Sequence, residues 1–94
     1  MEYPPQYDAI HDFIVKRKHL IWYVKDHRAL SEESIVEAVL NYGNWRDVQE
    51  VIQILGIEKL ARIFKKQTAR PRNNYYPEMR HYFTLYFNKY APHA

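Results

Sequence analysis

The chain has 94 residues, which is enough for one modest hydrophobic core but not for two. Its aromatic fraction of 16%, with nine Tyr, excludes a largely disordered chain, because so much aromatic surface needs burial or a partner. The absence of Cys excludes a disulfide framework and a thiolate zinc site.

Charge is distributed unevenly along the chain. Residues 1–57 contain six Lys/Arg and nine Asp/Glu, a net of −3, whereas residues 58–94 contain eight and two, a net of +6. A basic C-terminal part favours a polyanion or an acidic protein surface as partner. The alternative is intramolecular, with the acidic part facing the basic part, and charge counting leaves both open.

The N-terminal segment MEYPPQYDAI carries an acid and two prolines where a signal peptide has a positive end and an apolar run. The longest apolar run, residues 20–24, is too short to span a bilayer. We therefore expect a soluble, cytoplasmic protein that does not associate with membranes. We expect residues 1–6 and 91–94 to be flexible ends.

The first helix is predicted over residues 7–16, after two prolines that mark its entry. The segment 20–24 is aromatic and β-branched, so it is either extended or a helical turn. The apolar face of the first helix consists of Ala9, Ile10, Phe13 and Ile14.

The second helix is predicted to begin after Ser31, the best N-cap candidate in the sequence. Acidic residues in its first turn suit the positive end of the helix dipole. Gly43 is predicted to end this helix in a left-handed conformation. Its apolar residues at helical spacing are Ile35, Val36, Val39 and Leu40.

Asn44 is predicted to cap a third helix, and Gly56 to end it and lead into a fourth that runs to about Lys66. The expected buried residues of the third helix are Trp45, Val48, Val51, Ile52 and Leu55, and those of the fourth are Ile57, Leu60, Ala61 and Phe64.

Residues 67–76 are polar and are predicted to form a loop, after which Pro77 opens the last helix. Tyr75 and Tyr76 either cover a helix end or stack on unpaired bases. The apolar stripe of the last helix is the strongest in the chain, and it is predicted to be core, with a docking surface for part of it as the alternative. It consists of Met79, Tyr82, Phe83, Tyr86, Phe87 and Tyr90.

Together the elements predict a single all-α domain of four or five short helices, with a helix-turn-helix-like pair joined at Gly56 and the last helix packed across the middle three. Such a pair is typical of nucleic-acid-binding hairpins whose basic groups reach phosphates. The other interpretation is a solvated basic face, because the fourth helix has no Ser, Thr, Asn or Gln before Gln67 with which to read bases. The basic residues concerned are Lys59, Arg62, Lys65, Lys66, Arg70 and Arg72.

The polar residues form no motif for catalysis or metal binding. The five His include no HExxH arrangement and no pair four residues apart, and no glycine-rich phosphate loop is present. We expect the His side chains to lie at the surface, and we expect no enzyme activity, no metal and no cofactor.

A series of packing motifs covers residues 19–88: LIWYV (20–24), NYG (41–43), Trp45, GIEKL (56–60) and LYF (85–87). This pattern resembles a family of small bacterial helical domains of unassigned function that are often encoded beside AbiEii-like nucleotidyltransferase toxins. The chain departs from that family by the insertion RPRNNYY (70–76) before the closing motif. The resemblance implies an antitoxin role and transfers no catalytic residue.

We therefore expect a non-enzymatic partner-binding module, the antitoxin-like component of a bacterial toxin–antitoxin pair, whose protein partner is the toxin encoded nearby. The alternative is a small nucleic-acid-binding protein that uses the basic hairpin. Homo-oligomerisation is compatible with both. The candidate partner-binding residues are Glu32, Glu33, Glu37, Tyr82, Tyr86 and Tyr90.

Overall fold

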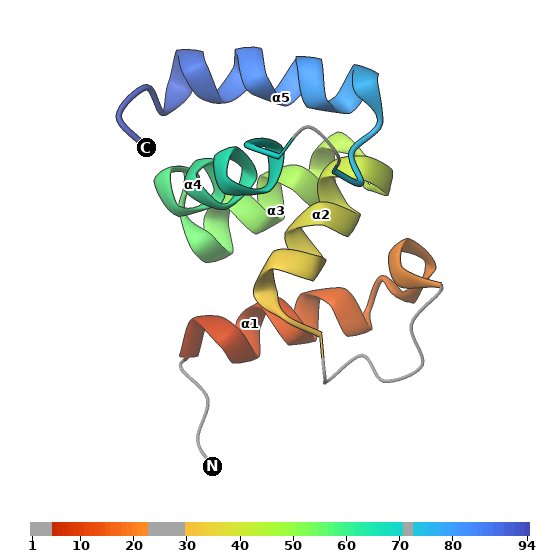
Figure 1. The fold of residues 1–94 in the computed structure, drawn as a ribbon. Coiled ribbons are helices and arrows are strands. Elements are labelled where there is room, and N and C mark those ends of the chain that lie inside the picture. Colours follow the sequence, from red (N-terminus) through yellow and green to blue (C-terminus); the bar gives the residue numbers. More distant parts are fainter. Residues whose placement is uncertain (1–4, 23–29, 71–72) are drawn as a thin grey trace.

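The computed structural model describes residues 5–22, 30–70 and 73–94, and these residues form helices and no strands (Figure 1). The all-α prediction is thereby confirmed. The elements are α1 (Pro5–Val15), a 3₁₀ helix η1 (Lys18–Ile21), α2 (Glu32–Tyr42), α3 (Trp45–Leu55), α4 (Ile57–Thr68) and α5 (Pro77–Tyr90).

Two predicted N-caps set the starts of α2 and α3. Ser31 Oγ accepts a hydrogen bond from the backbone N–H of Ser34 at 3.1 Å. Asn44 Oδ1 accepts from the N–H of Asp47 at 2.8 Å, and the Asp47 carboxylate accepts in return from the Asn44 N–H at 3.0 Å. This reciprocal pair is a capping box, which satisfies two helix-end groups at once.

The two glycines act in different ways. Gly56 has φ 87°, a conformation that side chains disfavour, and it joins α3 directly to α4 as predicted. The predicted left-handed cap at Gly43 is wrong, since its φ of −74° and ψ of 160° are ordinary extended backbone. Glycine is needed there for space, because a Cβ atom would lie 2.7 Å from the Val39 carbonyl oxygen and 3.1 Å from Asp47 Cβ.

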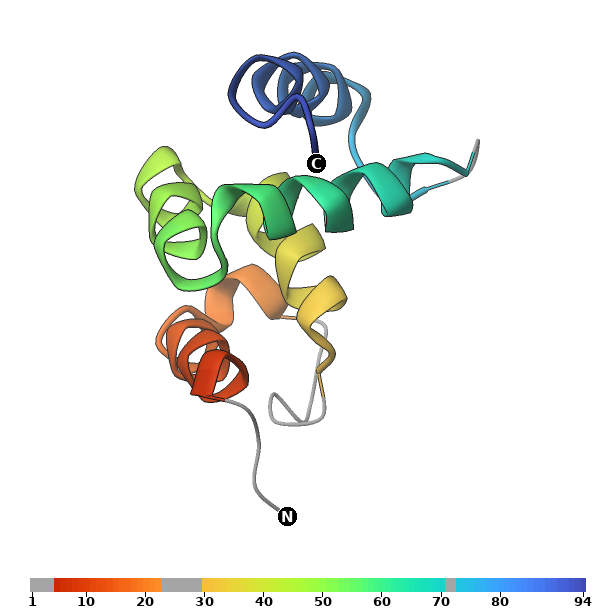
Figure 2. The same ribbon diagram turned by 90° about the vertical axis from the view of Figure 1, so that its left-hand side faces the viewer.

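α4 lies between the other elements. It packs against α2, α3 and α5, while α1 packs against α2, α3 and η1. α5 lies on one side of the molecule and α1 on the opposite side (Figures 1 and 2). α5 therefore has one face on α4 and α2 and one face outward.

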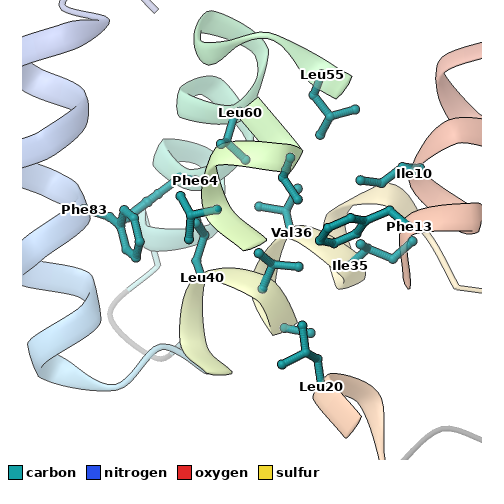
Figure 3. Packing of buried hydrophobic residues seen from close by; sticks show 14 of the residues in the cluster. Ile10, Phe13, Leu20, Ile35, Val36, Leu40, Leu55, Leu60, Phe64 and Phe83 are labelled. Carbon is teal, nitrogen blue, oxygen red and sulfur yellow. The ribbon is translucent and has the colours of Figure 1, made fainter. Parts of the chain in front are cut away.

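The hydrophobic core runs without interruption from α5 to α1 (Figure 3). At one end, the ring of Phe64 meets Phe83 and Phe87 edge to face and stacks on Tyr75 at a centroid distance of 5.1 Å. At the other end, Phe13 projects from α1 toward α2.

Some expected core positions are at the surface. Ala9 is exposed, and Trp45 keeps 44% of its surface in solvent. In the last helix only Phe83 and Phe87 are buried, so the prediction that its whole aromatic stripe is core is wrong for Tyr82 and Tyr90. An α-helix that packs on one side buries a stripe narrower than the full set of apolar residues in this sequence.

A charged network that the sequence did not reveal joins α1 to α3. Arg17 Nε donates to Asp47 Oδ1 at 2.7 Å, and its Nη2 donates to Glu50 Oε2 at 2.6 Å. The guanidinium also lies over the Phe13 ring, 4.1 Å from its centroid. Asp47 is buried, so one carboxylate both caps α3 and anchors α1.

Two further polar side chains are buried and engaged. His11, expected at the surface, is only 9% exposed, and its Nε2 donates to the Leu30 carbonyl at 2.9 Å. Asn41 Nδ2 donates to the Asn74 carbonyl at 2.9 Å, while Asn41 Oδ1 accepts from the Tyr76 N–H at 3.1 Å. Asn41 thereby fixes the segment that leads into α5.

The ends of the predicted elements differ slightly from those observed. α1 begins at Pro5, so residues 5 and 6 are helical, and η1 covers the start of the ambiguous segment 20–24. Residues 1–4 and 23–24 lie outside the described part of the chain. α4 continues to Thr68, and at the C-terminal end Ala91 is buried and accepts from the Ala94 N–H at 3.1 Å. Within the described residues, no helix has the length and apolar character needed to traverse a membrane.

Candidate protein-binding surface

Four aromatic side chains from α3 and α5 form a continuous surface, which we call the aromatic ridge: Trp45, Tyr82, Tyr86 and Tyr90. Tyr82 and Tyr86 are stacked with an interplanar angle of 15°, and Tyr86 and Tyr90 are 4.8 Å apart between centroids. The Trp45 ring meets Tyr86 edge to face at 5.4 Å. Tyr82 and Tyr90 are 49% and 53% exposed.

Local sequence explains why the ridge forms. The three tyrosines follow one another at intervals of four residues, so they lie on the same side of α5. Phe83 and Phe87 are buried beside them against Phe64 and hold α5 in place. The rings of the ridge therefore pack on one another while their outer edges remain in solvent.

A shallow apolar groove of about 410 Å³ lies beside the ridge, between α3 and α5. Trp45 and Tyr82 belong to both the groove and the ridge, and Met79 is half-buried between the helices. Gly43 and Asn44 contribute backbone and polar groups to its wall. Such a combination of aromatic and Met surface with a few polar groups is enriched in the cores of protein interfaces.

The hydroxyl group of Tyr86, the central tyrosine of the ridge, stays protonated at neutral pH. Partial burial, followed by the neighbouring Tyr90 and Tyr82 hydroxyls, raises the pKa of Tyr86 above its usual value. Neutral tyrosines offer an apolar ring and a hydroxyl that both donates and accepts. Lys89 Nζ lies 5.3 Å from the Tyr90 ring centroid, which adds a positive charge at one end of the ridge.

Two of the three acidic candidates of α2 use their side chains in contacts within the domain. Glu32 forms an ion pair with Lys59 at 3.1 Å, and Glu37 accepts from Asn74 Nδ2 at 3.2 Å. Glu33 is exposed, and its backbone carbonyl accepts from Gln67 Nε2 at 2.8 Å. These three residues do not belong to the aromatic ridge. The contacts of Glu32 and Glu37 are ones that hold α2 to α4 and to the segment before α5.

The basic candidates divide into two groups. Besides Lys59, Lys65 is engaged, since its Nζ donates to the Ala94 carbonyl at 3.1 Å. Arg62, Lys66 and Arg70 are exposed at four-residue intervals and form one row along α4 and the residues just after it. Arg72 lies outside the described residues. Glu58, also exposed and four residues before Arg62, places an acid at the start of this row.

Of the two alternatives for Tyr75, covering a helix end or stacking on unpaired bases, the structure shows a packing role. It is 6% exposed, stacks on Phe64, and donates its hydroxyl hydrogen to Gln67 Oε1. Burial, with a smaller effect of Glu37, raises its pKa far above that of a free tyrosine. Tyr76 is 48% exposed and meets Tyr42 edge to face.

Among the residues that the structure describes, no group of three or more His, Asp or Glu is arranged to hold a metal ion. Every buried side-chain polar atom in that part of the chain has a hydrogen-bond partner. The buried polar residues His11, Asn41 and Asp47 all serve contacts between elements of the fold.

Comparison of the chain with protein-family models, with curated proteins and with solved structures gives no match.

Two surface residues were not anticipated by sequence reasoning. Trp45 was expected in the core, yet at about 100° per residue it lies roughly 90° from the mean direction of Val48, Val51 and Leu55. This angular offset from the buried face of α3 is the feature of the sequence that indicates an exposed Trp45. Leu85 is 58% exposed on the outer side of α5 and was outside the predicted stripe.

Proposed function

We propose that this protein is a non-enzymatic module that binds another protein through the aromatic ridge. The observation that carries the proposal is the packing of Trp45, Tyr82, Tyr86 and Tyr90 into one partly exposed surface beside an apolar groove. Tyr and Trp dominate binding energy at protein interfaces, because they bury large area with few rotatable bonds.

We further propose that the partner is a toxin encoded by an adjacent gene, and that this cytoplasmic protein is its antitoxin. The support is the resemblance to small proteins encoded beside AbiEii-like nucleotidyltransferase toxins. The residues that carry it occupy the positions that organise the helices: NYG ends α2, Trp45 begins α3, and GIEKL forms the turn into α4. The closing LYF motif contributes Leu85 and Tyr86 to the outer and ridge sides of α5.

The test is co-expression with the product of the adjacent gene, followed by co-purification and rescue of growth. Wild-type protein is expected to co-purify and to relieve toxicity. Trp45→Ala and Tyr86→Ala are each expected to weaken the complex by roughly thirtyfold or more, since truncation of a central aromatic anchor costs about 2 kcal/mol.

The matched control is Trp22→Ala, which removes the same side chain at the end of η1, where Trp22 is 74% exposed and does not belong to the aromatic ridge. This variant should bind as wild type does. Equal weakening by Trp22→Ala and Trp45→Ala would refute the ridge as the contact surface. Failure to co-purify with either neighbouring gene product would refute the antitoxin assignment.

A second candidate function is nucleic-acid binding through α4. It is favoured by the exposed row of Arg62, Lys66 and Arg70 and by the net charge of +3. A single row of basic groups suits phosphate contacts, which depend steeply on salt. Duplex and single-stranded DNA titrations at about 50 and about 200 mM salt should then differ by tenfold or more, and Arg62→Glu with Lys66→Glu should abolish binding.

A further inference from the structure

The outer side of α5 carries a stripe with a distinctive order of charge. Glu78, Tyr82, Leu85 and Lys89 follow at intervals of four, three and four residues, which places them along one line of an α-helix. All four are exposed, with Tyr82 and Leu85 at 49% and 58%. None of the ion pairs formed among residues 5–22, 30–70 and 73–94 uses Glu78 or Lys89.

This stripe is complementary to itself when reversed. Glu78 lies in the first turn of α5 and Lys89 in the last turn, and Tyr82 and Leu85 lie between them. The midpoint between Glu78 and Lys89 falls between Tyr82 and Leu85. A twofold axis through that point would therefore place each Glu78 opposite a Lys89 and each Tyr82 opposite a Leu85.

We propose that this face binds a second copy of the same chain, with the two α5 helices antiparallel across a twofold axis. The acid and base of one copy pair with the base and acid of the other, and Tyr82 and Leu85 form the apolar centre. α5 is the outermost helix on its side of the fold, and none of the other helices that the structure describes covers its outer face (Figures 1 and 2). A second copy can thus approach without displacing any part of the domain.

Charge order selects the antiparallel arrangement. Parallel α5 helices would place Glu78 against Glu78 and Lys89 against Lys89, and like charges facing one another oppose association. Antiparallel packing also places the positive end of each helix dipole beside the negative end of the other, which is favourable. With a helix of about 21 Å, the interface is small, so the dimer is expected to be concentration-dependent, with dissociation in the micromolar range.

The inference goes beyond the proposed function, and it can be tested separately because Leu85 belongs to neither the aromatic ridge nor its groove, whereas Trp45 belongs to both and is not part of the stripe. The experiment is sedimentation equilibrium of the full chain at low salt, over protein concentrations from about 1 to about 200 μM, with circular dichroism as a check of folding. Wild type should show a monomer–dimer equilibrium. Glu78→Lys and Lys89→Glu, both at exposed positions, should each weaken dimerisation by roughly tenfold or more.

The decisive variant is the double exchange Glu78→Lys with Lys89→Glu, which restores opposite charges only in the antiparallel arrangement. Its dimerisation should return to within about threefold of wild type, and Leu85→Asp should give a monomer. A wild type that stays monomeric throughout, or a double variant that remains as weak as the single ones, would overturn the proposal. Trp45→Ala tests the proposed partner surface and should leave dimerisation unchanged, so the two proposals can fail separately.

Discussion

Arg17 holds Asp47 at 2.7 Å across a sequence separation of 30 residues, and the same guanidinium reaches Glu50 one turn further along α3. The Asp47 side chain is 8% exposed and that of Arg17 is 19% exposed, so this ion pair is largely screened from water. Together with the hydrogen bond from His11 to the Leu30 carbonyl, it ties α1 and the residues just after it to the rest of the domain.

Arg17→Met is expected to lower the free energy of unfolding by about 2–3 kcal/mol, because it leaves the Asp47 carboxylate buried without its counter-charge. Methionine keeps an aliphatic stem over Phe13, so the change is mainly electrostatic. Urea denaturation at neutral pH measures this change in the free energy of unfolding.

Adding Asp47→Asn to Arg17→Met should cost less stability than Asp47→Asn costs in the wild type, and strictly additive effects would contradict the coupling. Glu50→Gln is the control, with an expected loss below about 1 kcal/mol, since the Glu50 side chain is 39% exposed.

Asn41→Ala is expected to destabilise the protein by about 2 kcal/mol, because it leaves the Tyr76 N–H and the Asn74 carbonyl without their partner. Besides the lower stability of the whole domain, the segment 73–76 should open more readily than the rest of the protein. Hydrogen exchange of the Tyr76 amide should accelerate more than that of Ala38, a buried residue in the same helix. Uniform acceleration of both amides would show that Asn41 does not act on the 73–76 segment.

Replacement of the two glycines distinguishes the conformational requirement at Gly56 from the steric requirement at Gly43. Gly56→Ala and Gly56→Asn should each cost about 1–3 kcal/mol, since φ 87° with ψ 145° lies outside the left-handed helical region that Asn tolerates. Gly43→Ala should cost about 1–3 kcal/mol through its clash with the Val39 carbonyl. Thermal unfolding of the three variants checks this, and a stable Gly56→Asn variant would contradict the conformational reason.

Tyr75 links stability to alkaline pH. Its pKa is raised in the folded state by burial, so the folded protein retains a proton that the unfolded chain releases above about pH 10. Stability from this group is complete below that pH and should fall by as much as about 1.4 kcal/mol per pH unit above it.

Tyr75→Phe provides the matched comparison. At about pH 8 the variant should be less stable than wild type by about 1 kcal/mol, because it lacks the hydrogen bond to Gln67. Between about pH 10 and about pH 11 the difference should shrink or reverse, since Phe does not ionise. Urea midpoints at both pH values measure this, and parallel pH profiles for the two proteins would disprove the linkage.

Local sequence signals predicted the helices well. Ser31 and Asn44 cap α2 and α3 with their own side chains, and Pro77 opens α5, because each of these effects depends on residues within one helical turn. The all-α architecture follows from these signals together with the apolar spacing. Gly43 was misjudged because its role is to leave space beside the Val39 carbonyl oxygen and the Asp47 side chain, and a glycine after an apolar helical stripe does not distinguish a need for space from a need for positive φ.

The candidate site was predicted only in part. Tyr82, Tyr86 and Tyr90 come together as a helical spacing of four requires, but the contribution of Trp45 depends on how α3 and α5 pack. The burial of His11 and the pairing of Arg17 with Asp47 likewise depend on contacts between distant segments. Periodicity assigns a face to a residue, whereas only packing decides whether another helix covers that face.

The edge-on contact of Trp45 with Tyr86 supplies an intrinsic optical probe. The chain has two tryptophans, so a Trp22→Phe background leaves Trp45 as the sole indole emitter. Its emission then reports the separation of α3 from α5, because loss of the neighbouring ring changes the polarity around the indole. Detachment of the last helix can thus be followed in stopped-flow fluorescence, independently of the melting of the remaining helices recorded by far-ultraviolet ellipticity.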